Sequence, residues 1–490
     1  MSATAVTKAS GVLGTAALST FVVNVNTSAV AILLPSISAD LRTSLDVLQW
    51  AVTGYMLVGA ATIVTWGALG DVFGRRRMFV YGLLLFIVSC VVIALAGSGL
   101  MVVLGRVVQG AAGASIVASG MSLLSVGTGG AAQMRAVTLW GAAAAGGAAA
   151  GPVLGGVLNQ FTGWQGLFWV DAAIAAVCVP WTLRAVPESR DPGRSRSIDL
   201  AGTVLVAAIL VPFVFAMTKA STWGWVSVPT LVCLAISVLA CVGFVATERR
   251  IAAPLVDLRL LRNPLLVGST AAILIAAGAV AGLSLVISLY FQDPATLGMS
   301  SLQAGLASLP VAALVVLVAP LVTPLAHKFG ARPVVVAGFL LMTAGFLFLG
   351  AVRPSWSYVV FLPGLLAVAI GLGLSNGPAS SISTASVPQE EVGSASGISN
   401  MARYVGGAVL TAVVAGIYAS VSTRHLVTGG ATSSALATGF SRASIALAIF
   451  SAAGIALGLL VARHTRRPSA VDRATAAAAA VHTMPISTRP

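Results

Sequence analysis

The sequence predicts an all-α integral membrane protein with fourteen transmembrane helices. Of its 490 residues, 58% are hydrophobic and only 8% are charged, too few to cover the surface of a soluble protein. Apolar runs of about 20 residues recur along the chain, and each is long enough to cross a bilayer. Such runs must be helical because the bilayer offers no water to backbone groups, and they are too long for barrel strands. We place the spans at 11–35, 46–70, 77–97, 100–122, 135–157, 165–186, 199–219, 227–247, 264–291, 302–325, 331–351, 357–380, 397–420 and 442–463.

The basic residues are distributed according to the side of the membrane. The net charge of +14 could indicate a nucleic-acid partner, but arginines and lysines concentrate in the loops of one side, such as 75–77, 249–250 and 259–262. Positive loops of this kind mark the cytoplasmic side. With an even number of spans, both termini are then cytoplasmic. We therefore expect a plasma-membrane protein whose basic residues face anionic membrane lipids rather than nucleic acid.

The sequence indicates neither a metal site nor an organic cofactor. The four cysteines lie in apolar runs without metal-ligand spacing, and the four histidines fall in loops or in the C-terminal segment. The chain lacks the sequence G-x-x-x-x-G-K-[ST], which disfavours ATP-driven transport. It also lacks a catalytic constellation, so we expect a protein that is not an enzyme and that uses no metal or cofactor.

Charged segments between the spans indicate the domain organisation. Loop 187–198 is followed by Asp199, which can cap the next helix, and 248–263 alternates basic and apolar residues as an amphipathic surface helix would. These segments bracket spans seven and eight, which we interpret as a pair inserted between two six-helix halves. We expect an N-terminal six-helix bundle at 1–186, the inserted helices with cytoplasmic linkers at 187–263, a C-terminal six-helix bundle at 264–463 and a disordered cytoplasmic tail at 464–490.

The loop between the second and third spans reads G-A-L-G-D-V-F-G-R-R-R at residues 67–77. Its glycines would let two helix ends approach closely and turn tightly, and Asp71 could pair with Arg75 or with a neighbouring helix. The pattern resembles the corresponding loop of major facilitator superfamily transporters, G-x-L-x-D-x-x-G-R-[RK]. The alternative is an ordinary positive-inside loop. The resemblance implies a gating or coupling role for Gly67, Gly70, Asp71, Gly74, Arg75 and Arg76.

The fourth span carries an arginine, Arg106, in the sequence L-G-R-V-V-Q-G. An arginine within an apolar span is costly and normally faces a cavity or a partner. The sequence resembles the R-x-x-Q-G motif of the same superfamily, whose arginine is implicated in proton coupling or in supporting a charge network. The alternative is that Arg106 snorkels to the membrane surface.

The fifth span carries G-A-A-A-G-P-V-L-G-G at residues 147–156. The glycines permit close packing against a neighbouring helix, and the proline removes one helix hydrogen bond and bends the helix. The sequence resembles the antiporter motif of exporters in this superfamily, G-x-x-x-G-P-x-x-G-G, rather than a simple packing seam. The motif residues are Gly147, Gly151, Pro152, Gly155 and Gly156.

Further matches, at 254–260, 290–292 and 393–407, resemble the fourteen-helix drug:proton antiporter subfamily, with two departures. Asn26 stands in the first span where the subfamily usually has an aspartate, and an amide cannot bind and release a proton. Asp171 stands in the sixth span where the subfamily usually has asparagine. Asp171 is either a cap or interface residue near the outer end of its helix or a relocated proton or cation site, with Arg106 as a neighbour.

These observations together predict a secondary active exporter of small hydrophobic or amphipathic compounds, working by alternating access and proton antiport. We expect a monomer driven by the proton gradient. The alternatives are a dedicated exporter of one endogenous metabolite or self-made antibiotic, and a membrane sensor or scaffold without transport. The cavity should be lined by spans one, two, four and five and their second-half counterparts. Its polar candidates are Asn24, Asn26, Tyr55, Gln109, Asn400 and Arg403.

Overall fold

The computed structural model is helical throughout, with no strand among the residues it describes. Fourteen helices in this part of the chain are long and apolar enough to cross a membrane, which confirms the predicted number of spans. The predicted tail lies almost entirely outside the described residues. Those residues are 3–124, 130–190, 199–224, 226–251, 254–388 and 391–464.

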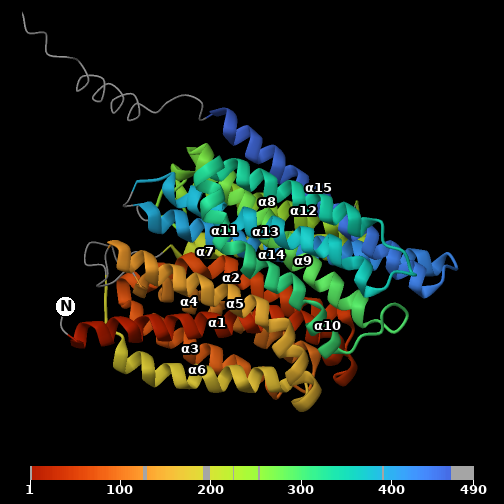
Figure 1. Cartoon of the computed structure of the whole chain (residues 1–490), viewed down its shortest axis with the longest axis horizontal. Coiled ribbons are helices and arrows are strands. Elements are labelled where there is room, and N and C mark those ends of the chain that lie inside the picture. Colours follow the sequence, from red (N-terminus) through yellow and green to blue (C-terminus); the bar gives the residue numbers. More distant parts are fainter. Residues whose placement is uncertain are drawn as a thin grey trace, which may run out of the picture.

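The helices form two layers that correspond to the two halves of the chain (Figure 1). The N-terminal layer contains α1 (Ala3–Asp40), α2 (Leu45–Phe73), α3 (Arg75–Ala94), α4 (Gly99–Leu124), α5 (Gly130–Thr162) and α6 (Gln165–Ala185). The C-terminal layer contains α9 (Pro264–Gln292), α10 (Ser301–Ala307), α11 (Leu309–Phe329), α12 (Ala331–Gly350), α13 (Tyr358–Ala385), α14 (Val392–Val427) and α15 (Thr432–His464).

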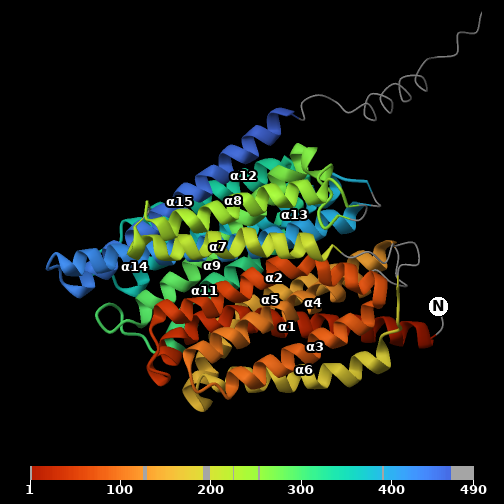
Figure 2. The same cartoon turned by 180° about the vertical axis from the view of Figure 1, so that it is seen from behind.

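The helix pair α7 (Leu200–Trp223) and α8 (Val228–Glu248) lies at the side of the molecule, where Figure 2 shows it. The two helices pack on each other, and α7 also contacts α2 of one layer and α14 of the other. Asp199 caps α7 as predicted, since its side chain accepts a 2.6 Å hydrogen bond from the Gly202 amide. The pair therefore rests against both halves through α7.

Local sequence explains where several helices begin and end. Gly74, with φ of 120°, separates α2 from α3, a backbone conformation that side chains rarely adopt. The predicted tenth span is divided at Ser308 into α10 and α11, and Pro310 near the start of α11 cannot donate the amide hydrogen bond needed to join them. Ser300 starts α10 with a capping box that includes Gln303.

The prediction of an amphipathic helix over 248–263 is wrong for the residues described there. Only Leu260–Arg262 forms a short 3₁₀ turn. Pro254 removes an amide donor, and Val256 and Leu260 are buried against Leu266 rather than turned toward lipid. Residues 254–263 thus form a linker of bends and turns that is packed against the protein.

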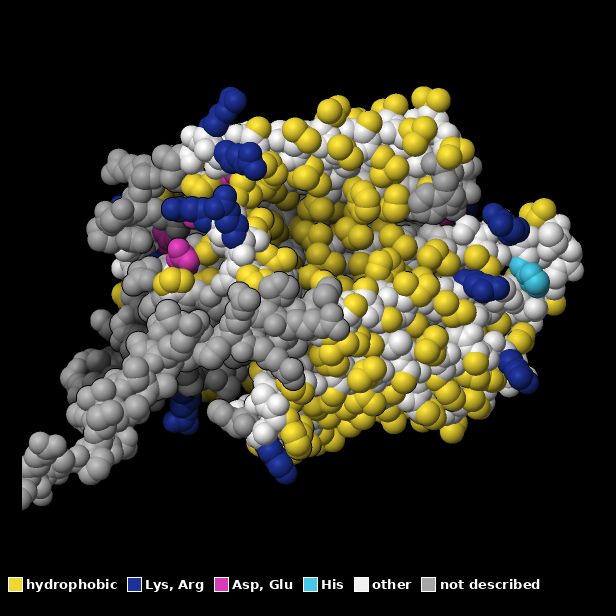
Figure 3. All heavy atoms as spheres, turned by 90° about the horizontal axis from the view of Figure 1, so that it is seen from above, with side chains coloured by type: hydrophobic (Ala, Val, Ile, Leu, Met, Phe, Trp, Pro, Cys, Tyr) yellow, Lys and Arg dark blue, Asp and Glu magenta, His cyan; other side chains and the backbone are white. Residues whose placement is uncertain are grey.

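The lipid-facing surface is apolar across the middle of the molecule. Figure 3 shows hydrophobic side chains over the central part of one face, with lysines and arginines gathered toward its ends. α8 illustrates the pattern, since Val232, Val238 and Leu239 are all exposed. A continuous apolar band of this kind is expected of a protein solvated by hydrocarbon.

Candidate functional site

A polar network joins α1, α4 and α6 inside the N-terminal half. The Asn26 amide nitrogen donates a 2.7 Å hydrogen bond to Asp171 Oδ2, and its oxygen accepts one from Arg106 Nη1. Arg106 Nη1 also donates to Gln109 Oε1 at 2.5 Å. None of these side chains is more than 2% exposed. The structure thus links Asp171 to Arg106, and Asn26 is the bridge between them.

The Arg106 guanidinium is enclosed by partners from several directions. Its Nε donates a 2.9 Å hydrogen bond to the Ala51 carbonyl, and its central carbon lies 4.3 Å from the centre of the Tyr55 ring. Because Arg106 has no exposed surface, it does not snorkel to the membrane boundary. Asp171 does not cap α6 either, because Trp164 holds the cap position.

The 67–77 loop is held within the N-terminal half by ion pairs. Arg75 Nη2 lies 3.1 Å from Asp71 Oδ1, one helical turn away. Arg76 and Arg77 approach Glu188, and the Arg76 amide donates to Glu188 Oε1 at 3.1 Å. Sequence reasoning missed Glu188. The signal was an acidic residue directly after span six, on the side of the arginine loop.

The three glycines of this loop differ in their surroundings. A Cβ added at Gly74 would lie 2.6 Å from Glu188 Oε1, and the backbone there already has positive φ. At Gly70 an added Cβ would make only ordinary contacts, such as 3.7 Å to the Arg75 Cα. At Gly67 it would meet no atom within 4 Å, so the expectation of close approach at Gly67 is wrong in this structure.

The glycine motif of α5 packs directly on α1. A Cβ at Gly147 would collide with the Phe21 carbonyl, one at Gly151 would lie 2.6 Å from the Val25 carbonyl, and one at Gly155 would lie 2.9 Å from the Ala29 Cβ. These three glycines follow one another at intervals of four residues, so they form one face of the helix. Backbone meets backbone along this seam.

Other residues of the same motif reach the C-terminal half. A Cβ at Gly156 would lie 2.6 Å from the Ser301 carbonyl, and a Cβ at Gly305 of α10 would collide with the Pro152 carbonyl. The motif therefore sits at a junction of α1, α5 and α10. It holds helices together within one half and also touches the other half.

A cavity with an empty volume of about 690 Å³ lies between the halves. Its walls come from α1, α5, α9, α10, α11 and α13, and they are apolar apart from Ser28, Ser284 and Ser308. α2 and α4 do not line it, in contrast to the prediction. The reason is close packing of α2 on α14, where a Cβ at Gly59 would lie 2.8 Å from the Tyr404 ring.

None of the six predicted polar residues lines this cavity. Asn26 and Gln109 are buried within the N-terminal half, Tyr55 is buried where α2 meets Tyr404 of α14, and Asn24 donates to the Thr20 carbonyl of its own helix. Asn400 and Arg403 are half-buried on α14. Arg403 donates to Asn376 of α13 at 3.1 Å. Helix periodicity alone does not say which face of α1 meets the other half, so the sequence could not place these side chains relative to this cavity.

One end of the cavity is closed by a polar clasp of Ser36, Asn159, Gln292 and Ser301. The Asn159 amide nitrogen donates to Ser36 Oγ at 2.9 Å and to Ser301 Oγ at 3.0 Å. Ser301 Oγ in turn donates to Gln292 Oε1 at 3.0 Å. Gln292 Nε2 donates to the Ile32 carbonyl at 3.0 Å. These bonds join the ends of α1, α5, α9 and α10 across the two halves.

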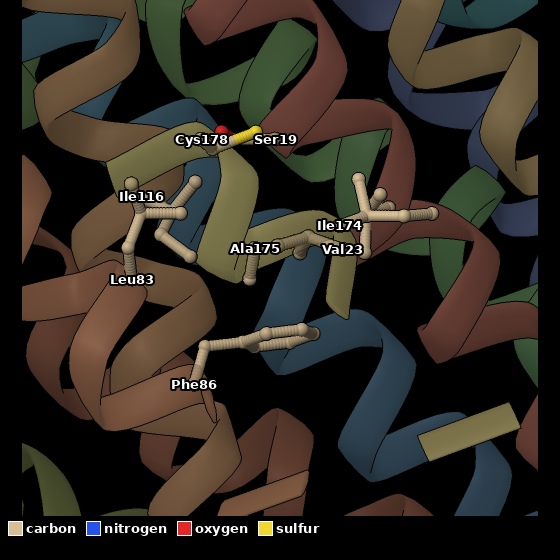
Figure 4. Close-up of a pocket in the computed structure, with 9 residues that line it drawn as sticks. Ser19, Val23, Leu83, Phe86, Ile116, Ile174, Ala175 and Cys178 are labelled. Carbon is tan, nitrogen blue, oxygen red and sulfur yellow. The ribbon is translucent and has the colours of Figure 1, made fainter. Parts of the chain in front are cut away.

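A second, smaller pocket lies wholly within the N-terminal half. Figure 4 shows its lining, with Ser19 and Cys178 together on one side and Phe86 on the other. It has no room for even a water molecule, whereas the cavity between the halves has about 100 Å³ of space for water-sized molecules. The larger cavity between the halves is the better candidate for a substrate.

Comparisons with known proteins agree with this arrangement. The model of the Major Facilitator Superfamily matches residues 16–411. The chain is 32% identical over 407 residues to the tetracenomycin C resistance and export protein of Streptomyces glaucescens, covering 82% of this chain and 75% of that protein. It is 32% identical to the multidrug resistance protein Stp of Mycobacterium tuberculosis, covering 82% and 74%. The solved structure of a bacterial homologue of the human lysosomal transporter Spinster has the same fold, with a TM-score of 0.65, 16% identity and coverage of 93% and 97%.

Proposed function

The chain belongs to the major facilitator superfamily, and on that premise we propose that it exports small hydrophobic or amphipathic compounds across the plasma membrane in exchange for protons. The observation that carries the proposal is the apolar cavity between the halves, closed at one end by the polar clasp. A cavity enclosed on one side of the membrane is one state of an alternating-access cycle. The cavity is formed within one chain, which supports a monomer.

The positive-inside rule supports the orientation in this proposal. The loop that carries Arg75, Arg76 and Arg77 would face the cytoplasm, together with both termini. The polar clasp lies at the end of α1 opposite to its N-terminus and would therefore face outward. The substrate would then enter the cavity from the cytoplasmic side or from the inner leaflet.

The buried network supplies the candidate for proton coupling. Asp171 is the one acidic residue, among those described, that lies in the interior of a span rather than at its end or in a loop. A carboxyl group can bind a proton and release it, whereas Asn26 cannot. Protonation of Asp171 would change its hydrogen bond to Asn26 and, through Asn26, the position of Arg106. A local proton would thereby alter contacts among three helices.

Transport by inside-out vesicles tests the proposal. Vesicles with an acidic lumen should accumulate members of a panel of radiolabelled amphipathic drugs, and collapse of the pH gradient should stop accumulation. Asp171→Asn should bind the same drugs but lose the response to the gradient. The matched double variant, with Asn26→Asp added, returns a carboxyl group to the same hydrogen bond and should regain the response.

Two results would contradict these statements separately. Accumulation no greater than that of protein-free vesicles, for every drug in the panel, would contradict export. Full gradient-driven accumulation by Asp171→Asn would leave export standing and remove Asp171 as the coupling group.

Export of a single compound is the second candidate function, because one relative is named for export of tetracenomycin C. Transport restricted to one member of a broad panel would favour it.

A further inference from the structure

A second arginine lies within the spans, and its surroundings differ from those of Arg106. Arg403 belongs to α14, where its side chain is half-buried and donates a 3.1 Å hydrogen bond to Asn376 Oδ1. A guanidinium carries five N–H donors, so this bond uses a small part of its capacity. No ion pair of Arg403 occurs among the described residues. A cation in this setting calls for a partner.

Arg106 is also an arginine within a span, but its guanidinium has more hydrogen-bond partners than that of Arg403. The Arg106 guanidinium is fully buried; Ala51 accepts from its Nε, Asn26 and Gln109 accept from its Nη1, and the Tyr55 ring covers one face. That arginine has no surface left for another molecule. Arg403 keeps some exposed surface and unused donors on α14 of the other half.

The position of Arg403 continues the wall of the apolar cavity. Val368 and Leu372 of α13 line the cavity, and Asn376 follows Leu372 by four residues, so it lies one turn along the same face. The Arg403–Asn376 pair thus stands at the edge of the cavity.

Among the described residues, no acidic or basic side chain lines the cavity. Asp171 points to Asn26 inside the N-terminal half, and Ser28, which does line the cavity, lies on the opposite face of α1 from Asn26. In the part of the chain that the structure describes, Arg403 therefore has no carboxylate in the cavity wall and no ion-pair partner to cancel its charge. A low-dielectric cleft with one cation attracts anions and repels cations.

We infer that the exported compound carries an anionic oxygen, a carboxylate, enolate or phenolate, on an otherwise apolar body. Arg403 holds the oxygen, the amide nitrogen of Asn376 is free to donate a second hydrogen bond, and the body occupies the apolar cavity. This inference rests on the proposed export function, since it names the class of compound that the same cavity takes.

Three matched probes test the inference with the purified full-length chain in lipid nanodiscs. They are 4-(1-pyrenyl)butyrate, 4-(1-pyrenyl)butanol and the trimethylammonium analogue, which differ in charge at one end of the same apolar body. Fluorescence titration should show that the carboxylate binds about tenfold or more tightly than the ammonium compound. Arg403→Gln should reduce this ratio to about threefold or less, and Arg403→Lys should retain part of it as a point charge.

A second variant keeps the test decisive if Arg403→Gln does not fold. Asn376→Asp leaves the arginine in place and gives it a carboxylate partner at the existing hydrogen bond, so it should abolish the preference for the anion. Equal binding of the anion and cation by the native chain would overturn the inference. So would an unchanged preference in both variants. A preserved anion preference without vesicle transport would count against the proposed export function alone.

Discussion

Asp71 and Arg75 form an ion pair whose energetic and mechanical roles can be separated. Their side chains are 15% and 21% exposed, and both Nε and Nη2 of Arg75 lie 3.1 Å from the same carboxylate oxygen. A partly exposed pair of this kind contributes about 0–1 kcal/mol to stability. Its position between α2 and α3, next to the Gly74 break, is what makes it a suitable gate element.

We therefore expect Asp71→Asn to separate folding from transport. The variant should reach the membrane in normal amount and keep a thermal unfolding temperature close to that of the native chain. Its efflux should fall by about tenfold or more if the carboxylate holds one of two alternating states. Arg75→Lys is the matched comparison, since it keeps the charge but offers one nitrogen instead of two. Efflux at the native rate by Asp71→Asn would show that this pair does not control the gate.

The residues of the candidate site were easier to find in the sequence than their contacts. Arg106 and Asp171 stand out because ionisable groups are rare in apolar spans. Their connection through Asn26 depends on which helices are neighbours and on which faces meet, and spacing along one helix does not specify either. Asn26 was consequently assigned to the substrate cavity, whereas the structure places it in the interior of the N-terminal half.

At the scale of elements, the sequence predicted close packing along the glycine face of α5, and the structure shows that α1 packs on this face. Gly147, Gly151 and Gly155 predicted a smooth helix face, and the structure shows α1 backbone against that face. The partner helix was not predictable, because a glycine face fits any helix that approaches it. The prediction of a helix over 248–263 failed for a different reason. Its alternating basic and apolar residues suggested a helix, but Pro254 removes an amide donor and Val256 and Leu260 are buried.

Gly151→Leu should separate α5 from α1 and block transport. Its side chain would meet Ser28 and the Val25 carbonyl, and overpacking of this kind typically costs about 1–3 kcal/mol. Gly141→Leu is the matched control, because it places the same side chain on α5 where no atom lies within 4 Å of an added Cβ. Thermal unfolding and vesicle transport should both be impaired by the first substitution and little changed by the second. Equal behaviour of the two variants would mean that the seam is not tightly packed in the membrane.

At the scale of the whole molecule, the two halves meet in two distinct ways. α2 and α14 pack closely, with the rings of Tyr55 and Tyr404 6.4 Å apart. The polar clasp joins the same halves at one end through hydrogen bonds. The span count could be predicted from hydropathy, because bilayer thickness dictates helix length. The closed end could not be predicted, since the serines and amides that form it are common in any loop-proximal segment.

The clasp allows the alternating-access cycle to be stopped in one state. Ser36 Oγ and Ser301 Oγ lie 3.0 Å apart, so cysteines at both positions can approach disulfide geometry. The experiment needs a background without Cys90, Cys178, Cys233 and Cys241. In that background, oxidation of the Ser36→Cys/Ser301→Cys variant should abolish vesicle transport, and dithiothreitol should restore it.

The controls for this cross-link distinguish locking from damage. Either cysteine alone should be indifferent to oxidation, because a single thiol cannot bridge α1 and α10. Drug binding from the cytoplasmic side should survive in the oxidised double variant, since the cavity remains beside the closed end. If a fully cross-linked protein transports at the native rate, the two halves do not part at this end during transport, and export must follow a route that leaves the clasp shut. Loss of transport together with retained binding is the result that two rigid halves rocking about a central cavity require.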